Sequence, residues 1–583
     1  MTFHNMFNRQ IAEIFLKIAD TLELKNENIF KVRAYRTAAQ NITGLTRQLS
    51  EIYEEDPSKI GDIPGIGKDL KAKIIELIET GELKFYDELI TTFPPGFIDL
   101  LNISRLGPKK LRKLQEELGV EDIEDLEKAC KTGKLEKIEG MGKKTQDKLL
   151  EGIKHFRKKA GRMLLPEAYK HAEAVMAYLK GSKNFKRIEK AGSLRRGKDT
   201  VGDIDILALV GNSEKAMDLF VKYPGVDSVI AKGSTKSSIS LKGGVQIDLR
   251  IVENKSFGAA LVYFTGSKEH NIKIRHIAKK LNYKVNEYGV FSTGKSGKEK
   301  YIKGKTEEEV YDVLGLQWIP PELRENSGEI EASQKKEVLG TLLKLKDIKG
   351  DLHVHSTASD GRDTLENIAK AAEKRGYKYL AVTDHSKLVK VAGGMDEKQL
   401  LKRADQVRKI SKKFKGVKIL MGVEVDILGD GKLDLEDYAL KEMDIVIAAI
   451  HSKFSLDKDF QTARVLKAMN NKYVNVLAHP SGRLITTRNP LELDFDKIFR
   501  KAADKNIFLE INTHGDRIDL NDVNCRRAKE LGAKLVINTD AHEIAQLDNI
   551  VYGVMTARRG WIEKKDVLNT YSLEKVLKML KRK

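Results

Sequence analysis

The chain of 583 residues is several times longer than a usual single domain, so we expect about three to five compact units. Hydrophobic residues make up 41% and charged residues 33%, which argues against general disorder, and no run of 18 uncharged apolar residues predicts a transmembrane helix. The N-terminal segment has no basic region followed by an apolar core, so no export signal is expected. We therefore expect a cytoplasmic protein without membrane association.

Two cysteines, Cys130 and Cys525, lie far apart in sequence and predict neither a disulfide framework nor a Cys-type zinc site. The net charge of +20 indicates a polyanionic partner, although a lysine-rich solvated surface would give the same composition. Motifs that hold phosphate would favour the first interpretation.

The hydrophobic pattern of the N-terminal third is helical. Residues 1–90 and 91–158 read as short amphipathic helices joined by glycine-containing turns, with Ile11, Phe15 and Ile18 at helical spacing. From about residue 185 strand-like runs such as DIDILALV and VQIDLRIV predict an α+β unit.

A boundary is predicted near Pro320 and Pro321, followed by a charged stretch that we interpret as a polar linker or short helix over 320–346. Beyond it short apolar strands alternate with helical segments at intervals of roughly 25 to 35 residues, the rhythm of an α/β barrel or doubly wound sheet.

Three turns in the helical region have the glycines of a phosphate-binding loop. They stand in IPGIGKDL, ISRLGPKKL and IEGMGKKTQDKL. Glycine lets the backbone approach a phosphate, and the amides of the next helix point at the anion. One such turn is usually structural, but three favour helix-hairpin-helix motifs, although Arg105 replaces the first glycine of the middle copy. The glycines expected at DNA are Gly65, Gly67, Gly107, Gly140 and Gly142.

The segment AGSLRRGKDTVGDIDI carries a second constellation. Asp203 and Asp205 are two residues apart, so strand alternation puts both carboxylates on one face, and Asp248 could join them from a neighbouring strand. Three carboxylates can hold two magnesium ions for nucleotidyl transfer, with Ser193 and Arg196 on the triphosphate. The alternative is an Asp-x-Asp pair that merely ends a surface strand.

The motifs GSLRRG, GDIDI, QIDLR and YFTGSKEHN strongly resemble the family X DNA polymerases over residues 1–318. The resemblance implies a lyase-like helical domain (1–90), fingers (91–158), a nucleotidyltransferase palm (159–260) and a thumb (261–319). It implies metal-binding carboxylates at Asp203, Asp205 and Asp248, which would hold Mg²⁺ or Mn²⁺. The residues it implies around the nucleotide are Gly192, Ser193, Arg196, Gly202, Tyr263, Phe264, Gly266, Asn271 and Arg275. Lys268 departs from the vertebrate enzyme, which has an acidic residue there.

Some members of that family also remove a 5′-deoxyribose phosphate by Schiff-base chemistry. The matching nucleophile is Lys73, with Lys31 and Tyr35 as phosphate and support groups. The reaction needs an uncharged amine, whereas Asp69 would favour an ammonium. Lys73 as an ordinary solvated helix lysine remains the alternative.

Histidines and carboxylates gather at strand ends in the C-terminal half. They are His353, His355, Asp360, His385, Glu424, His451, His479, Asp540 and His542. Strand C-termini are where barrel enzymes collect their ligands, and alternation directs His353 and His355 to one side. A single such histidine is usually structural, but the whole set is hard to assign to core packing.

The series HVHSTASDG, TDHS, GVEVDI, IHS, AHP and NTDAH strongly resembles the polymerase-and-histidinol-phosphatase (PHP) domain over about 347–583. The resemblance implies a distorted seven-stranded α/β barrel with three Mn²⁺ or Zn²⁺ ions and all nine ligand positions present. Glu424 would bridge two of the metals, and clustered ions would activate water for attack on a phosphodiester. His514 matches no ligand position and is expected at the rim.

Together the resemblances indicate the long form of family X polymerase found in bacteria and archaea, expected to be a monomer. We expect it to fill short gaps in nicked or gapped duplex DNA with a 5′ phosphate, using dNTPs, in base excision repair. The PHP domain would supply 3′-5′ exonuclease or other 3′-end processing, with AP endonuclease and lyase activities as further expectations. The alternatives are a DNA phosphoesterase whose polymerase core only holds DNA, a non-catalytic end-binding scaffold, a template-independent transferase and a small-molecule phosphatase.

Overall fold

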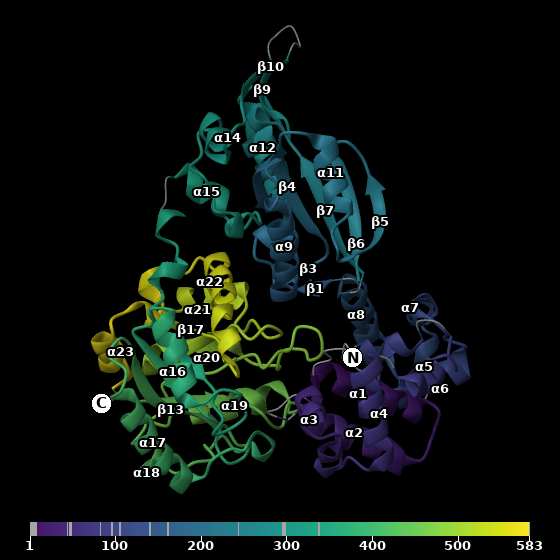
Figure 1. Cartoon of the computed structure of the whole chain (residues 1–583), viewed down its shortest axis with the longest axis vertical. Coiled ribbons are helices and arrows are strands. Elements are labelled where there is room, and N and C mark those ends of the chain that lie inside the picture. Colours follow the sequence, from purple (N-terminus) through teal and green to yellow (C-terminus); the bar gives the residue numbers. More distant parts are fainter. Residues whose placement is uncertain are drawn as a thin grey trace. The chain divides into compact units, whose positions relative to one another are not determined.

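The computed structural model describes residues 8–43, 45, 49–81, 83–94, 97–103, 106–138, 141–159, 162–242, 244–293, 299–335 and 339–581 (Figure 1). The chain forms two compact units. One comprises the residues up to 160 with the short segments 357–362 and 389–394, and the other comprises the rest of the chain. Among the described residues no helix is both long enough and apolar enough to cross a membrane.

The N-terminal unit is helical, as predicted. Its first part contains α1 (Asn8–Leu24), α2 (Ile29–Thr43), α3 (Leu49–Glu55), α4 (Lys68–Thr80) and α5 (Lys84–Ile90). The predicted face of α1 is confirmed, since Ile11, Phe15 and Ile18 are fully buried in the core of this part. The second part contains α6 (Pro108–Leu118), α7 (Ile123–Lys131) and α8 (Lys143–Lys159) around a separate core.

The palm follows with a five-stranded mixed sheet in the order β2-β4-β7-β6-β5. Its elements are α9 (Leu165–Lys180), β2 (Phe185–Lys190), α10 (Gly192–Arg195), β4 (Ile204–Val210), α11 (Ser213–Val221), β5 (Val226–Lys232), β6 (Lys236–Leu241) and β7 (Val245–Ile251). Strands β4 and β7 are parallel, whereas their outer neighbours are antiparallel. A short ladder of β1 (Met163–Leu164) and β3 (Thr200–Val201) lies outside this sheet.

The thumb consists of α12 (Phe257–Thr265), α13 (Lys268–Lys280), β8 (Tyr283–Asn286), β9 (Gly289–Thr293), β10 (Glu299–Lys303) and α14 (Glu307–Val313). For the segment 320–346 we expected a polar linker or short helix. Its described residues contain short helices, including α15 (Glu329–Gln334), and they bury Leu323 and Ile330 in the thumb core, which a solvated linker would not do. Apolar side chains spaced through the charged stretch account for this packing, because they remove more surface from water than an extended linker could.

The C-terminal part is the predicted seven-stranded barrel. Its parallel strands follow chain order: β11 (Gly350–Val354), β12 (Tyr379–Val382), β13 (Lys418–Asp426), β14 (Ile445–Ala449), β15 (Val476–Leu477), β16 (Phe508–Asn512) and β17 (Leu535–Asn538). A parallel bridge between Val354 and Ala541 brings the first and last strands together, so the barrel is nearly closed. Almost every strand residue is buried, as expected for parallel strands covered on both faces.

Helices cover the outside of the barrel strands (Figure 1). They are α16 (Leu365–Lys374), α17 (Glu397–Ser411), α18 (Asp437–Leu440), α19 (Lys458–Ala468), α20 (Phe495–Lys505), α21 (Asp522–Glu530) and α22 (Ile550–Arg559). The last helix, α23 (Leu573–Leu580), instead packs through Val576 and Leu580 on the cluster of side chains inside the barrel. Parallel strands joined in this way direct all their C-terminal ends to one face. The predicted histidines and carboxylates follow those ends.

Candidate active sites

The three glycine turns each stand directly before a helix. Gly67 precedes α4, Gly107 precedes α6 and Gly142 precedes α8, and a Cβ built at any of the three meets no atom within 4 Å. Gly65 has φ +77°, a conformation that favours glycine. Gly140 lies outside the described residues. The first amides of these helices are therefore open to an anion such as a DNA phosphate.

The predicted lyase residues gather around one aromatic ring. Lys73 Nζ lies 4.8 Å and Lys31 Nζ lies 5.5 Å from the centroid of Phe85, and the ring of Tyr35 stacks on the same side chain. Lys73 also pairs with Asp69 at 2.5 Å. Burial and Asp69 raise the pKa of Tyr35 far above its usual value, which keeps its hydroxyl neutral. Phe85 was not among the predicted site residues. The sequence marks it only by its position in α5, the helix that follows α4 and Lys73.

The palm carboxylates lie on adjacent strands. Asp205 of β4 and Asp248 of β7 are register partners, and Asp203 precedes β4. Burial, with Asp203 and Asp248 nearby, raises the pKa of Asp205 to about 6. A cluster of carboxylates that repel one another in this way is typical of a cation site.

The side chain of Lys236 also contacts this carboxylate cluster. Lys236 Nζ lies 2.7 Å from Asp248 Oδ2, and Gln246 donates to Oδ1. Burial raises the pKa of Asp248, but these partners outweigh burial and lower it below the ordinary value. Lys236 thus provides positive charge to a buried carboxylate beside the other two.

The loop before β4 holds the predicted triphosphate residues. Gly192 has φ +59°, and a Cβ there would lie 2.6 Å from Asp205 Oδ2, so only glycine fits. Arg196 donates to Glu325 Oε1 at 3.0 Å and to the carbonyl of Thr265. Ser193 lies in α10 between these two positions, and Gly202 stands at the end of the same loop.

The predicted sugar and base residues are on α12 and α13. Asn271 Nδ2 donates to the carbonyl of Tyr263 at 2.7 Å, and Arg275 Nε donates to the carbonyl of Asn271. The rings of Tyr263 and Phe264 meet edge to face. Gly266 ends α12 with φ +72° beside the guanidinium of Arg196, which links this group to the triphosphate loop.

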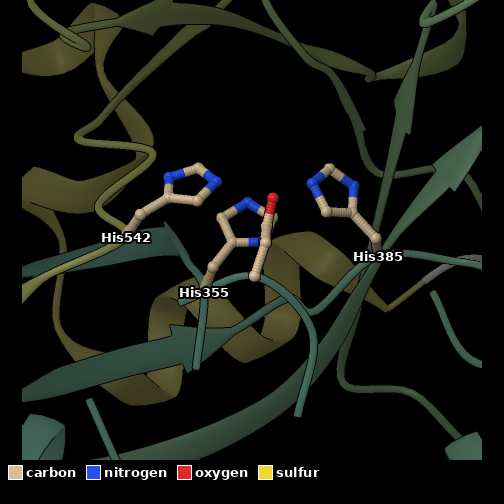
Figure 2. Close-up of side chains that lie close together, drawn as sticks. His355, His385 and His542 are labelled. Carbon is tan, nitrogen blue, oxygen red and sulfur yellow. The ribbon is translucent and has the colours of Figure 1, made fainter. Parts of the chain in front are cut away.

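The C-terminal cluster brings the predicted ligands together at the strand ends. Among the described residues, three groups have ligand atoms all within 4.8 Å of one another, and all three lie here rather than in the palm. The groups are His355, Asp360, His385 and His542; His353, His355 and Asp540; and His385, Glu424 and His451. Figure 2 shows the rings of His355, His385 and His542 converging on one space. His355 and His385 each belong to two groups, so the groups adjoin.

Glu424 of β13 is the centre of the cluster. Its Oε1 lies 3.0 Å from His479 Nε2 and 3.4 Å from His451 Nε2, and its Oε2 lies 2.8 Å from His385 Nδ1. Burial would raise the pKa of Glu424, but the surrounding histidines lower it well below its usual range. An ionised carboxylate between imidazoles has the two oxygens that a bridging ligand needs.

The donor set fits divalent metals. His353 Nε2 and His355 Nε2 face each other at 3.1 Å, and both lie within 3.4 Å of Asp540 Oδ1. Burial alone would lower the pKa of His353, but Glu510, Asp540 and Glu424 raise it well above normal. Buried imidazoles and carboxylates at this density suit manganese or zinc.

Glu510 is a functional residue that the sequence reasoning missed. This fully buried carboxylate of β16 lies 2.7 Å from His353 Nδ1 and accepts from the backbone N–H of His479 at 2.8 Å. It therefore orients two predicted ligands from behind, the arrangement that usually fixes a metal-binding imidazole. A signal was present, because a glutamate inside the apolar strand FLEIN is rare unless it is paired.

Asp426 and His514 are further residues that lie beside the predicted metal ligands of the barrel. Asp426, two residues beyond Glu424 on β13, lies 3.3 Å from His451 Nδ1, and the spacing of two could have predicted it. His514 is outside the three groups, as expected for a rim residue. It pairs with Asp516 at 2.8 Å, and its ring lies 6.0 Å from that of His542.

The fold and these sites define a DNA-binding nucleotidyltransferase joined to a barrel phosphoesterase. Four families match in the same order along the chain: a helix-hairpin-helix domain (6–83), a SAM-like helix-hairpin-helix tandem (97–155), the DNA polymerase beta thumb (260–325) and the PHP domain (351–514). Proteins named "Probable phosphatase" from Acetivibrio thermocellus and Syntrophotalea carbinolica are 31% and 33% identical, each over 34% of this chain and 83% and 80% of their own lengths.

A further relative spans almost the whole chain. It is the protein named "DNA polymerase/3'-5' exonuclease PolX" of Bacillus subtilis, which is 40% identical over 99% of this chain and 100% of its own length. The chain therefore belongs to the family X DNA polymerases that carry helix-hairpin-helix domains and a C-terminal PHP domain.

Proposed function

We propose that this protein fills short gaps in DNA at the palm and trims 3′ ends at the PHP cluster. The observation that carries the proposal is the presence of two separate carboxylate centres, one on the palm sheet and one at the barrel strand ends. The B. subtilis relative is named for both a polymerase and a 3′-5′ exonuclease.

At the palm, Asp203, Asp205 and Asp248 would hold Mg²⁺ or Mn²⁺. Bound ions there would activate the primer hydroxyl and neutralise charge on the leaving pyrophosphate. Ser193 and Arg196 would hold the triphosphate, and the glycine at 192 leaves room for it beside Asp205. Tyr263 and Asn271, joined by a hydrogen bond, would form the sugar and base side of the pocket.

At the barrel, the nine predicted ligands would hold Mn²⁺ or Zn²⁺. Metal ions held by these ligands would supply the positive charge that lowers the pKa of a water molecule and draws charge from a phosphodiester. Glu510 and Asp426 would hold His353 and His451 in orientation. Arg517, whose Nε lies 3.8 Å from Asp540 Oδ2, would bring positive charge to the phosphate.

The DNA partner would be a gapped or nicked duplex with a 5′ phosphate, bound by a monomer in the cytoplasm. Three glycine turns with open helix amides supply contacts to the backbone without reading its sequence. The net charge of +20 favours the same partner.

A single assay tests both activities. A primer labelled at a one-nucleotide gap with a 5′ phosphate is incubated with manganese, with and without dNTPs. We expect the wild type to shorten the primer without dNTPs and to extend it with them. Asp205→Asn should abolish extension alone, and His353→Ala should abolish shortening alone.

Other outcomes identify the alternatives. Extension that survives Asp205→Asn would mean that the palm assignment is wrong, and shortening that survives His353→Ala would mean the same for the barrel. A protein that shortens but never extends DNA would be a phosphoesterase that uses the palm to hold its substrate. Salt-dependent binding without either reaction would indicate a scaffold.

A further inference from the structure

The palm and the PHP barrel share a packed interface within the second compact unit. Ile485, Ile518 and Met555 of the barrel belong to the same hydrophobic cluster as the palm core. The loop after α10 reaches this interface, because a Cβ built at Gly197 would lie 3.1 Å from the Met555 side chain. The nucleotide loop of the polymerase thus rests on the barrel domain.

A barrel arginine is bonded directly to the backbone of that loop at Arg196. Arg559, the last residue of α22, is only 5% exposed. Its Nη1 donates to the main-chain carbonyl of Arg196 at 3.0 Å and to Glu325 Oε1 at 3.0 Å. Its Nη2 donates to Asp522 Oδ2 at 2.5 Å, so a barrel carboxylate holds the other side of the guanidinium.

Glu325 connects this arginine to the side chain of Arg196. The same Oε1 that accepts from Arg559 also accepts from Arg196 Nε at 3.0 Å. Arg196 Nη1 donates to the carbonyl of Thr265, at the end of α12. Arg196 is therefore held at its backbone by the barrel and at its guanidinium by Glu325 and the thumb.

We propose that Arg559 of the PHP domain is a positioning residue of the polymerase site, holding the Arg196 main chain and Glu325 so that the Arg196 guanidinium meets the dNTP triphosphate. This inference rests on the triphosphate role proposed above for Arg196. A planar guanidinium that donates in several fixed directions can hold three groups at once, which an ammonium cannot do with the same geometry.

Removal of Arg559 has two consequences that act in the same direction. The carbonyl of Arg196 loses its donor, so the loop gains freedom that nucleotide binding must then remove. Glu325 also loses one of its cationic partners, which include Lys198, and competes more strongly with the triphosphate for Arg196. Both effects weaken binding of the dNTP in the ground state and in the transition state by a similar amount. The dNTP KM therefore rises while kcat stays nearly unchanged.

The same helix provides a matched control. Arg558, one residue earlier, also crosses to the polymerase part, where it pairs with both oxygens of Glu322 and donates to the carbonyl of Leu343. None of these contacts is to the nucleotide loop. Arg558→Ala therefore removes comparable interface contacts without touching Arg196.

The test measures dNTP KM and kcat for filling a one-nucleotide gap, and 3′-end removal without dNTP, in the same preparations. For Arg559→Ala we expect a dNTP KM about tenfold above wild type, with kcat and 3′-end removal within about twofold. Arg559→Lys should give an intermediate KM, and Arg558→Ala a KM like that of the wild type. Thermal unfolding shows whether each variant folds. If Arg559→Ala does not fold, the dNTP KM of Arg559→Lys decides the test.

Three results would overturn the proposal. The first is an unchanged KM in folded Arg559→Ala, or in Arg559→Lys where that variant decides. The second is an equal rise in Arg558→Ala, which would make the effect one of domain docking. The third is an unchanged KM in Arg196→Ala, which would remove the triphosphate role and the positioning role together. An effect of Arg196→Ala without one of Arg559→Ala refutes the positioning role alone.

Discussion

At the scale of single residues, ionisable side chains of the proposed sites are held in place by charged partners, which come from a distant strand, a neighbouring strand or the same helix. Glu510 lies behind His353, Lys236 pairs with Asp248, and Asp69 pairs with Lys73. Each pair restricts a side chain that the proposed chemistry needs in one position. The first and last pairs lead to different expectations when the carboxylate is neutralised.

Glu510→Gln should weaken metal binding at the barrel. The amide loses the charge that orients His353, and loss of such a partner typically lowers metal affinity or activity about 10- to 100-fold. Manganese titration by calorimetry and 3′-end removal would both show the change. Asp444→Asn serves as the control, since Asp444 is a carboxylate of the same barrel that accepts the backbone N–H of Met421 rather than a bond from a predicted metal ligand. Equal losses in the two variants would contradict a specific role for Glu510.

Asp69→Asn should increase Schiff-base formation by Lys73. The substitution removes the carboxylate that pairs with Lys73 Nζ at 2.5 Å, and a free amine is the nucleophile. Borohydride trapping on DNA with a 5′-deoxyribose phosphate measures the adduct, with Lys73→Ala as the blank. An adduct that persists in Lys73→Ala would assign the reaction to another amine.

At the scale of elements, three helices begin at glycine turns and a network of charged side chains joins the thumb to the palm. Helices α4, α6 and α8 begin at open glycines, while α14 is tied to the palm through charge. Glu307 on α14 accepts from Arg195 through both oxygens, from Arg324 and from the indole of Trp318. The thumb is thereby fixed to the helix that carries the nucleotide loop.

The open glycines predict a loss of DNA binding without a loss of stability. A methyl group at Gly67 and Gly107 meets no protein atom, and their φ values of −79° and −81° suit alanine. The methyl would instead lie where a phosphate approaches. The variant with alanine at 67, 107 and 142 should bind gapped DNA about tenfold more weakly, since each lost charged hydrogen bond has a measurable cost. Fluorescence anisotropy and thermal unfolding measure the two quantities. Gly429→Ala is the control, since a Cβ there would lie 3.9 Å from Lys453 Cγ, an ordinary van der Waals distance.

Glu307→Gln should destabilise the thumb at neutral pH. Burial would raise the pKa of Glu307, but Arg324 and Arg195 lower it far below its usual value. A depressed pKa stabilises the fold above the ordinary glutamate value of about 4.3 and ceases to do so as the pH falls towards the folded value. Breaking a buried pair costs about 3–5 kcal/mol.

The measurement uses the fluorescence of Trp318, which donates to Glu307 at 3.1 Å, in a Trp561→Phe background. At pH 7 we expect a lower unfolding midpoint for Glu307→Gln than for the parent. Below about pH 4 the difference should shrink, because the parent loses the stabilisation that the variant never had. Exposed Glu308→Gln is the control, and a difference that grows on acidification would refute the network's role.

At the scale of the whole molecule, positive charge and two reaction centres belong to one chain. The net charge of +20 attracts DNA regardless of its sequence, and we expect the helix starts to add localised contacts. A protein that neutralises several phosphates releases counterions, so its affinity depends steeply on salt.

Gapped-DNA binding should therefore fall by at least about a hundredfold between 50 and 200 mM salt. The plot of log affinity against log salt should be linear, and the variant with three alanines at 67, 107 and 142 should have a shallower slope. Binding that barely changes over this range would indicate that stacking or base contacts dominate.

The amino-acid sequence by itself determined most of the architecture and the identity of most site residues. Helical and strand periodicity, glycine turns and strand-end histidines are local patterns, and each reports its own element without knowledge of the rest. Hence the seven barrel strands, the helical N-terminal unit and the convergence of the predicted ligands at the strand ends all agree with the structure. The metal-binding and nucleotide-binding roles of these residues stay predictions.

Only the tertiary structure decided which distant side chains meet. Glu510 and His353 are 157 positions apart, and Arg559 and Arg196 are 363 positions apart, so no local pattern relates them. The burial of Leu323 and Ile330 in the thumb core and the contact of Lys73 with the ring of Phe85 likewise depend on tertiary packing. Periodicity fixes which face of an element is buried, but the partner across that face depends on how whole elements pack, and therefore on contacts that form together when the chain folds.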